Sequence, residues 1–267
     1  MTLTEVRRLL DLLDLRPSKV LGQNFLIDAN ILRIILEQAD IRPDETVVEV
    51  GPGLGVLTFA LAACARRVVA VEKDPRLFDY LRRQRWPNVE LVHGDGVEAP
   101  LSVSAPFKVV SNLPYSVSTP VLERFVEAGE KPRRMVVTVQ REVAERLAAK
   151  SGTEDYGALT LWTQVYYHVT LAHVVSPGCF YPKPHVDSAI VVMDRRDPRV
   201  KLEPGAPFHA IVRLGFNQRR KMLKKLLAAY DNVSAAFEAV GISPTARGEE
   251  LGLDQWIQLA NELRPRS

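Results

Sequence analysis

Glycines and acidic residues stand at the ends of three valine-rich runs in the first hundred residues. Three glycines with the spacing G-x-G-x-G begin at Gly51, directly after the first run; Glu72 ends the second run, and Asp95 follows the third. If the runs are parallel strands, these residues share the edge at which open α/β sheets bind ligands. Glycines let the backbone approach a ligand closely, and carboxylates accept hydrogen bonds from ribose hydroxyls and an adenine amino group. The pattern predicts a nucleoside-containing cofactor.

The glycine spacing selects among such cofactors. In the dinucleotide fingerprint G-x-G-x-x-G the last glycine comes one residue later than Gly55 does here. S-adenosylmethionine (SAM) carries an adenosine without a pyrophosphate, so it fits this loop better than NAD does. An NAD-dependent oxidoreductase is also disfavoured because no acid or base for hydride transfer is evident. We therefore expect SAM as the cofactor.

Polar and aromatic residues follow the fourth valine-rich run, residues 107–111. The side-chain oxygen of Asn112 can accept one N–H of an exocyclic amine, and a backbone carbonyl near Leu113 can accept the second. Two acceptors would turn the nitrogen lone pair towards a methyl donor, and Tyr115, after Pro114, can stack on the base. The sulfonium of SAM is already an activated donor, so no side-chain nucleophile is needed. We predict methyl transfer to a base amine at these four residues.

The elements that must position these residues alternate between strand and helix. Short apolar runs predict strands at residues 46–50, 68–72, 89–92, 107–111, 135–139 and 189–193. The segments between them are long enough for crossover helices. This alternation predicts a doubly wound, mostly parallel α/β sheet, and the nearly continuous apolar runs indicate strands covered on both faces.

The character of the sequence changes near residue 197. A polar stretch at residues 195–199 and a turn signal at 203–205 precede helical patterns without a convincing strand. We therefore expect two domains, a sheet domain of residues 1–196 and a small all-helical domain of residues 197–267.

Composition limits the class of protein. The chain has 267 residues, of which 46% are hydrophobic and 25% charged, as in ordinary globular proteins. Its net charge of +3 does not by itself identify a nucleic-acid binder. Two cysteines and five histidines, without H-x-x-x-H spacing, predict no metal site. Charges interrupt the leucine-rich N-terminus, and no window approaches the length of a membrane span, so we expect a soluble, cytoplasmic protein.

Several motifs resemble the rRNA adenine N6-dimethyltransferase family, and within it the bacterial small-subunit (16S) enzymes. They are residues 23–26 (QNFL), 49–55 (EVGPGLG), 112–115 (NLPY), 180–188 (FYPKPHVDS), 216–221 (FNQRRK) and 247–251 (RGEEL). The similarity runs from about residue 19 to 251, with one departure at Gly248, where a residue better suited to a helix is expected. The resemblance implies a seven-stranded, Rossmann-like SAM methyltransferase sheet with a helical C-terminal domain.

The resemblance also implies roles for individual residues. The implied SAM contacts are Asn24, Leu26, Gly51, Glu72, Asp95 and Asn112, with residues 16–27 as a lid over the cofactor. Asn112, Leu113, Pro114 and Tyr115 are implied to form the target site, with Phe180 clamping the adenine against Tyr115. The implied reaction dimethylates N6 of two adjacent adenines in the 3′-terminal hairpin loop of 16S rRNA, during biogenesis of the small ribosomal subunit. A monomer is the family's usual state.

Basic residues without acidic neighbours mark residues 206–230 as a candidate RNA-binding surface. The candidates are Arg213, Arg219, Arg220, Lys221, Lys224 and Lys225, together with Arg141 after the fifth predicted strand. On a helix, Lys221 and Lys225 would lie one turn apart and share a face. A charge run is commonly just a solvated face, but phosphate neutralisation dominates RNA affinity. In an RNA-modifying enzyme these residues are therefore expected to bind RNA.

Two other functions stay open. A large-subunit rRNA adenine dimethyltransferase of the macrolide-resistance type shares the cofactor and NLPY motifs, although residues 180–188 and 216–221 favour the small-subunit enzymes. A non-catalytic ribosome-assembly factor could use the same fold to recognise immature subunits. The intact motif at residues 112–115 argues against a purely structural role.

Overall fold

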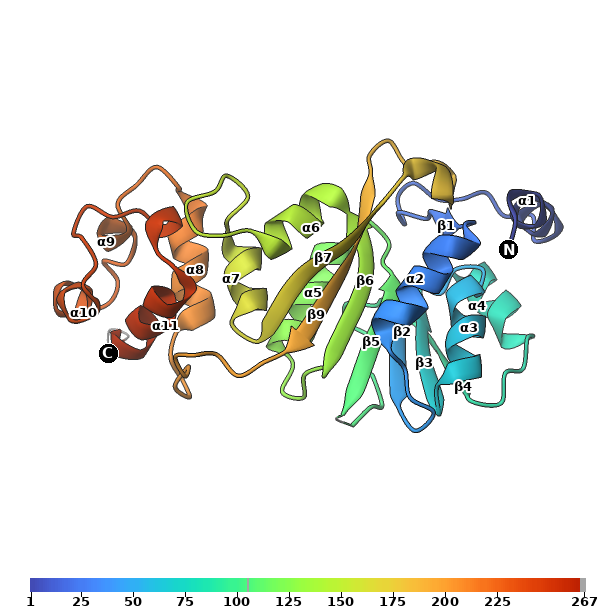
Figure 1. Cartoon of the computed structure of the whole chain (residues 1–267), viewed down its shortest axis with the longest axis horizontal. Helices are drawn as coiled ribbons and strands as arrows, with labels where there is room; N and C mark the ends of the chain where they lie inside the picture. Colours follow the sequence, from blue (N-terminus) through green and yellow to red (C-terminus); the bar gives the residue numbers. More distant parts are fainter. Residues whose placement is uncertain (105, 265–267) are drawn as a thin grey trace. The chain divides into compact units, whose positions relative to one another are not determined.

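The computed structural model describes residues 1–104 and 106–264, which form two compact units (Figure 1). Unit 1 comprises Met1–Ala144 and Val169–Arg195. Unit 2 comprises Glu145–His168 and the chain from Arg196 onwards. Within the described ranges, no helix has the length and apolar character needed to cross a membrane.

A seven-stranded sheet runs through unit 1 in the order β4-β3-β2-β5-β6-β9-β7. Its strands are β2 (Thr46–Val50), β3 (Arg67–Glu72), β4 (Val89–His93), β5 (Phe107–Asn112), β6 (Arg134–Gln140), β7 (Tyr167–Val175) and β9 (Ser188–Arg195). Strands β2 to β6 pair in parallel, and β9 is antiparallel to β6. The predicted doubly wound, mostly parallel sheet and its six predicted strands are confirmed.

The strand that sequence reasoning missed, β7, lies at one edge of the sheet. Its side chains alternate between partly covered and exposed, with polar residues such as His168 and His173 among them. Continuous apolar runs mark only strands covered on both faces, so this pattern escaped detection. The opposite edge strand, β4, is also only partly buried, which corrects the expectation that all six predicted strands are covered on both faces.

Helices α2 (Ala29–Ala39) and α3 (Val56–Cys64) pack on one face of the sheet, in front of it in Figure 1. Alternate strand residues such as Val47, Ala70 and Val110 join Ile35 and Leu61 of these helices in the main apolar cluster. The other helices of unit 1 are α1 (Leu3–Leu12), α4 (Pro75–Arg82) and α5 (Ser118–Glu127). Strands β2, β5 and β6 are buried at nearly every position, as expected of strands covered on both faces.

A second, two-stranded sheet joins the predicted lid to a distant segment. Strand β1 (Phe25–Leu26) pairs antiparallel with β8 (Phe180–Tyr181), so that Leu26 faces Phe180 and Phe25 faces Tyr181. Because side chains alternate along a strand, Leu26 and Phe180 enter the main apolar cluster. Phe25 and Tyr181 instead pack into a second cluster with residues of α1 and α4.

Unit 2 is a helical assembly around a fully buried Trp256. Its helices are α7 (Ala158–Gln164), α8 (Phe208–Asn217), α9 (Leu223–Leu226), α10 (Val233–Val240) and α11 (Leu253–Glu262), and α6 (Arg141–Ala148) spans the boundary between the units. A Cβ on Gly248 would lie 3.1 Å from both the Gly215 carbonyl oxygen and the Trp256 ring. Close packing therefore explains a glycine where a helix former was expected.

The division into units differs from the expected domains at residues 145–168, which the sequence placed with the sheet. These residues pack with the C-terminal helices instead. The Tyr156 hydroxyl donates to the Leu251 carbonyl at 2.9 Å, and the Tyr156 ring meets Phe216 edge-on at 5.8 Å. Both contacts join positions far apart in the chain, so local pattern could not reveal them.

Lys108 is a buried charge at the end of β5 remote from the strand's carboxyl end. Its ammonium donates to the carbonyls of Ala39, at 3.1 Å, and Asp40, at the C-terminal end of α2, and pairs with Glu45 at 2.8 Å. Lys108→Met is expected to lower the free energy of unfolding by about 1–3 kcal/mol, because it leaves the Ala39 and Asp40 carbonyls without this donor, while Glu45 keeps its pair with Arg133. Urea denaturation measures this change.

The control variant is Arg33→Ala, which removes an exposed ion pair with Glu37 on α2. Its expected cost is about 0.5 kcal/mol or less, since exposed pairs are weak. A Lys108→Met protein as stable as this control would contradict the assigned role of Lys108.

Candidate active site

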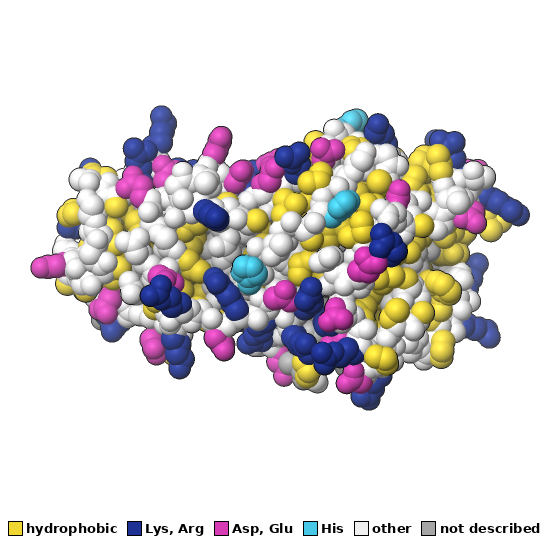
Figure 2. Space-filling view, in the orientation of Figure 1, with side chains coloured by type: hydrophobic (Ala, Val, Ile, Leu, Met, Phe, Trp, Pro, Cys, Tyr) yellow, Lys and Arg dark blue, Asp and Glu magenta, His cyan; other side chains and the backbone are white. Residues whose placement is uncertain are grey.

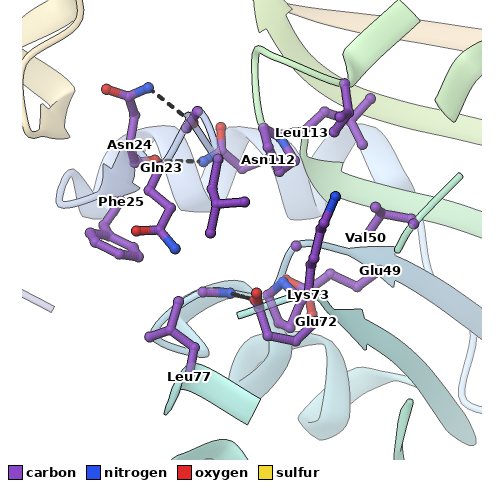
Figure 3. A pocket seen from close by; sticks show the side chains of 18 of the residues that line it. Gln23, Asn24, Phe25, Glu49, Val50, Glu72, Lys73, Leu77, Asn112 and Leu113 are labelled. Carbon is purple, nitrogen blue, oxygen red and sulfur yellow. Dashed lines mark hydrogen bonds between the residues drawn. The ribbon is translucent and has the colours of Figure 1, made fainter. Parts of the chain in front are cut away.

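A cavity of about 290 Å³ opens at the carboxyl ends of β2, β3 and β5 in unit 1 (Figure 3). Its lining includes all the predicted cofactor residues and four of the predicted target-site residues: Asn24, Leu26, Gly51, Glu72, Asp95, Asn112, Leu113, Pro114 and Tyr115. Figure 3 shows Asn112 and the lid on one side and Glu49 and Glu72 on the other. Residues predicted separately from five segments thus share one cavity.

The glycine loop after β2 packs too tightly for side chains. Gly51, Gly53 and Gly55 have positive φ angles of 71°, 60° and 80°, a backbone region that favours glycine. A Cβ on Gly51 would lie 2.8 Å from the Pro114 ring, and one on Gly53 would lie 3.1 Å from Phe25. The loop is therefore the cradle at which the lid and the predicted target site converge.

Glu72 holds this loop from the end of β3. One carboxylate oxygen accepts the Gly53 N–H at 3.0 Å, and the other accepts the Asp74 N–H at 2.8 Å. Burial raises the pKa of Glu72 to about 7, against the opposing effect of these hydrogen bonds. Each oxygen has a second lone pair, so Glu72 can also accept hydrogen bonds from two ribose hydroxyls.

Glu49 is a cavity residue that sequence reasoning missed. It is only 1% exposed, and its Oε2 atom has no hydrogen-bond partner among the described residues. Burial, and secondarily the charge of Glu72, raise the pKa of Glu49 to about 8. The signal in the sequence was a carboxylate inside an apolar run, since buried glutamate is rare unless it is paired. A bound cation would supply the missing partner.

Asp95 lines the cavity beyond Glu72. One oxygen accepts the Val97 N–H at 2.9 Å, and the other pairs with the Lys73 ammonium at 2.7 Å. The Lys73 hydrogen bond, followed by that from Val97, lowers the pKa of Asp95. Asp95 is therefore an ionised acceptor at the rim, suited to an adenine amino group.

The predicted lid is anchored by its own polar residues. Gln23 Oε1 accepts the Ser18 N–H at 2.8 Å, and its Nε2 donates to the buried Asp74 carboxylate at 3.1 Å. Gly22, with a φ of 64°, packs against Ser116, where a Cβ would come within 2.8 Å of the backbone nitrogen. These contacts hold residues 18–26 over the glycine loop.

In the side-chain amide of Asn112, the nitrogen has a hydrogen-bond partner and the oxygen has none. Its Nδ2 donates to the Asn24 carbonyl oxygen at 3.0 Å (Figure 3). Its Oδ1 is buried and has no partner among the described residues. Such an oxygen carries an unmet need for a donor, and Asn112 lines the cavity. Asn112 thus brings to the cavity wall an acceptor that no donor among the described residues meets.

The predicted pair of aromatic residues is not assembled in this structure. Tyr115 lines the cavity, but Phe180 does not: it is 2% exposed and lies in the main apolar cluster. Its register opposite Leu26 in the β1–β8 pair turns its side chain into that cluster. The expected clamp of a base between Tyr115 and Phe180 is therefore corrected for this conformation.

An adenosine-bearing cation fits the residues that are present. The glycine cradle admits close backbone approach, Glu72 and Asp95 offer acceptors, and the Glu49 oxygen needs a positive or donating partner. In the described ranges, no group of three or more histidine, cysteine or acidic side chains is arranged to hold a metal ion.

The predicted RNA-binding residues differ in whether they contact other residues of the protein. Arg219 is structural: its guanidinium donates to the Glu154 and Tyr156 carbonyls at 2.9 and 2.8 Å and pairs with Glu249 at 3.3 Å. Its side chain is still 41% exposed, so beside this role within unit 2 its contact with RNA stays a prediction. Arg213 stacks over Trp162 at 5.3 Å.

Three exposed cations, Arg220, Lys221 and Lys225, border a hollow of about 670 Å³ in unit 2. Lys221 precedes the short helix α9, so the expected shared helical face is wrong, and Lys224 does not line the hollow. In unit 1, Arg141 pairs with Asp187 at 3.8 Å. Figure 2 shows basic and acidic side chains interspersed over the face it displays.

Glu49 leads to a prediction about pH. Because its pKa in the folded protein, about 8, exceeds the ordinary 4.5, its stability contribution is complete at low pH and is lost as pH rises towards 8. Glu49→Gln removes this loss. The stability of the variant relative to the wild type is expected to grow by on the order of 1 kcal/mol per pH unit between about pH 5 and 8.

Denaturant unfolding across this pH range, without ligand, measures the difference. The exposed Glu37→Gln serves as the control and should follow the wild type. Parallel curves for the Glu49→Gln protein and the wild type would rule out the raised pKa of Glu49.

Comparison with known proteins agrees with this geometry. A curated relative, the ribosomal RNA small subunit methyltransferase A of Clostridium acetobutylicum, is 37% identical, covering 96% of this chain and 97% of its own. The solved 23S rRNA methyltransferase ErmE is 33% identical, with a TM-score of 0.68, covering 90% of this chain and 99% of its own. A dimethyladenosine transferase from Plasmodium falciparum, 23% identical, shares the fold with a TM-score of 0.75, covering 88% and 95%.

The family model described as ribosomal RNA adenine dimethylase matches residues 16–264. That span includes the lid, the glycine loop, the cavity residues and the helices of unit 2. The resemblance stated from the sequence motifs is therefore confirmed. The chain belongs to the ribosomal RNA adenine dimethylase family.

Proposed function

We propose that this chain transfers methyl groups from SAM to N6 of two adjacent adenines in the 3′-terminal hairpin loop of 16S rRNA, giving dimethyladenosines. The observation that carries the proposal is the uncommitted Oδ1 atom of Asn112, buried at the cavity beside the glycine loop. A hydrogen-bond acceptor without a donor in the protein could accept an N–H from the amino group of the substrate adenine.

The cofactor would be held by the residues on the carboxyl ends of β2 to β4. When bound, SAM supplies an electrophilic methyl group on a positively charged sulfur. Glu72 would accept the ribose hydroxyls, Asp95 the adenine amino group, and Glu49 would face the positively charged part of the cofactor. The Gly51 loop would follow the ligand with its backbone.

The target amine would be oriented by the lid as well as by the sheet. With Asn112 Nδ2 committed to the Asn24 carbonyl, Oδ1 accepts one N–H of the adenine amino group. A second acceptor, the carbonyl expected near Leu113, would leave the nitrogen lone pair aimed at the methyl carbon. Tyr115 would support the base by stacking. Catalysis is then mainly orientation and exclusion of water.

The choice of RNA is proposed from the curated relatives. The Clostridium acetobutylicum protein is named for the small subunit and matches nearly the full length of both chains. ErmE, named for 23S rRNA, has a similar fold, so cofactor chemistry alone does not separate the two substrates. The small ribosomal subunit is the partner proposed here. The cytoplasmic location and monomeric state expected from the sequence stay predictions.

The RNA would be held in part by the exposed cations of unit 2. Arg220, Lys221 and Lys225 have no ion-pair partner within the described part of the chain, and they line a hollow together with apolar side chains such as Leu214 and Met222. Unpaired cations neutralise phosphates without breaking existing contacts. Arg219 would instead keep the surface in shape.

The experiment on function incubates the protein and labelled SAM with small subunits from cells that lack the corresponding methylation. Nucleoside mass spectrometry of the 3′-terminal rRNA fragment is expected to find dimethyladenosine. Asn112→Ala should lower the rate by about 10²- to 10³-fold, the range for removing a preorganised polar group. The exposed Asn30→Ala serves as the matched control and should retain full activity.

Labelled methyl groups found only in large-subunit RNA would show that the protein is instead a dimethyltransferase of the macrolide-resistance type. Tight, salt-sensitive binding without label in either RNA would leave a non-catalytic assembly factor. Binding of the Asn112→Ala protein to subunits, measured in parallel, separates recognition from methylation.

The salt dependence of RNA binding tests the unit 2 surface. Lys221→Ala and Lys225→Ala should each weaken RNA binding. Each variant makes one phosphate contact fewer and so releases fewer counterions on binding, which should reduce the slope of log affinity against log salt by about 0.7–0.9. Filter binding at several salt concentrations measures the slope. Lys201→Ala, an exposed lysine outside the hollow, should leave it unchanged, and equal slopes for all three variants would contradict the proposed surface.

A further inference from the structure

Tyr115 has a hydroxyl contact that its predicted stacking role does not explain. Its phenol oxygen shares a hydrogen bond with the Ser188 hydroxyl. Ser188 is fully buried, and Tyr115 is largely buried while its residue still lines the cavity. The ring that faces the predicted base is thus fastened at its far end to the interior of the sheet.

Strand β6 contacts the chain close to each of the two residues that make this hydrogen bond. Ser188 opens β9 and pairs with Gln140 at the end of β6. Leu113, two residues before Tyr115, donates its N–H to the Thr138 carbonyl of β6 at 3.1 Å. Strand β6 therefore sets the distance between the Tyr115 loop and the Ser188 hydroxyl, and the register of β9 sets the position of that hydroxyl.

The contact restricts where the Tyr115 ring lies. A hydrogen bond at the hydroxyl fixes the far end of the ring, and with it the direction of the ring's long axis. Asn112, three residues earlier, has its amide fixed by the lid. A base stacked on a fixed ring would keep its amino group at one place relative to Asn112 Oδ1.

We propose that Ser188 is a positioning residue for the target base: its hydroxyl holds the Tyr115 phenol, and so the ring on which the adenine stacks. The inference rests on the proposed function and adds a residue to it. Ser188 does not line the cavity. Its effect passes through Tyr115, so it should alter turnover of RNA and leave cofactor binding unchanged.

The experiment is a double-mutant cycle of Ser188→Ala and Tyr115→Phe on the full-length protein. The substrate is whichever ribosomal subunit the wild type methylates. Each single variant is expected to lower kcat by about five- to tenfold, the effect of one lost hydrogen bond. The Kd for SAM should stay near wild type, and the Tm should fall by only about 2–5 °C, because one buried hydroxyl loses its partner. The double variant should be no slower than the slower single variant, because both changes remove the same bond.

The control is Thr163→Val, which removes a buried α7 hydroxyl that has no hydrogen-bond partner among the described residues and does not line the cavity. It should retain wild-type kcat. The ratio of dimethyl to monomethyl product is a further readout, since a loosened ring should slow the second transfer, which needs the bulkier monomethyl base in register. A general loss of packing would instead lower Tm and SAM affinity together.

The outcomes separate this inference from the proposed function. A wild-type protein without activity on either subunit would overturn the proposed function. An active wild type with unchanged kcat in Tyr115→Phe, or with additive losses in the double variant, would overturn the role of Ser188 alone. Tyr115→Phe keeps the ring, so this test remains decisive even if Ser188→Ala is too unstable to assay.

Discussion

The hydrogen bond from Asn112 Nδ2 to the Asn24 carbonyl is the contact on which the site depends. An amide whose nitrogen is committed presents its oxygen elsewhere, and here that oxygen is left without a partner among the described residues. The carbonyl stays in place because Gln23 is bound to Asp74 and β1 is paired with β8. The direction of the Asn112 acceptor therefore depends on the lid being ordered.

Buried ionisable groups have different surroundings at the two ends of the sheet. At the end remote from the cavity, Lys108 is paired with Glu45 and with helix carbonyls. At the ligand edge, Glu49 keeps an oxygen without a partner, and its pKa is raised to about 8. A buried polar group without a partner costs free energy. Its presence at the cavity reserves a place for a ligand at the expense of the stability of the empty protein.

Unit 2 uses residues of one basic cluster for two purposes. Arg219 closes hydrogen bonds within the unit, whereas Lys221 and Lys225 leave their ammonium groups at the border of a hollow. Of these neighbouring residues, Arg219 thus stabilises the surface, and the two lysines present positive charge on it. A similar division separates Phe180, which packs in the core, from Tyr181, which packs against the N-terminal helix.

The sequence by itself determined the parallel sheet, the six apolar strands and the edge at which the cofactor residues meet, because strand periodicity and strand ends are local properties. Only the tertiary structure decided that β7 completes the sheet, that Phe180 is buried, that residues 145–168 join unit 2, and that Arg219 is structural. It also decided which amide atom of Asn112 is free, since its partner lies 88 residues away. Spacing along the chain identifies which residues approach a site; the partners of each atom depend on contacts between distant segments.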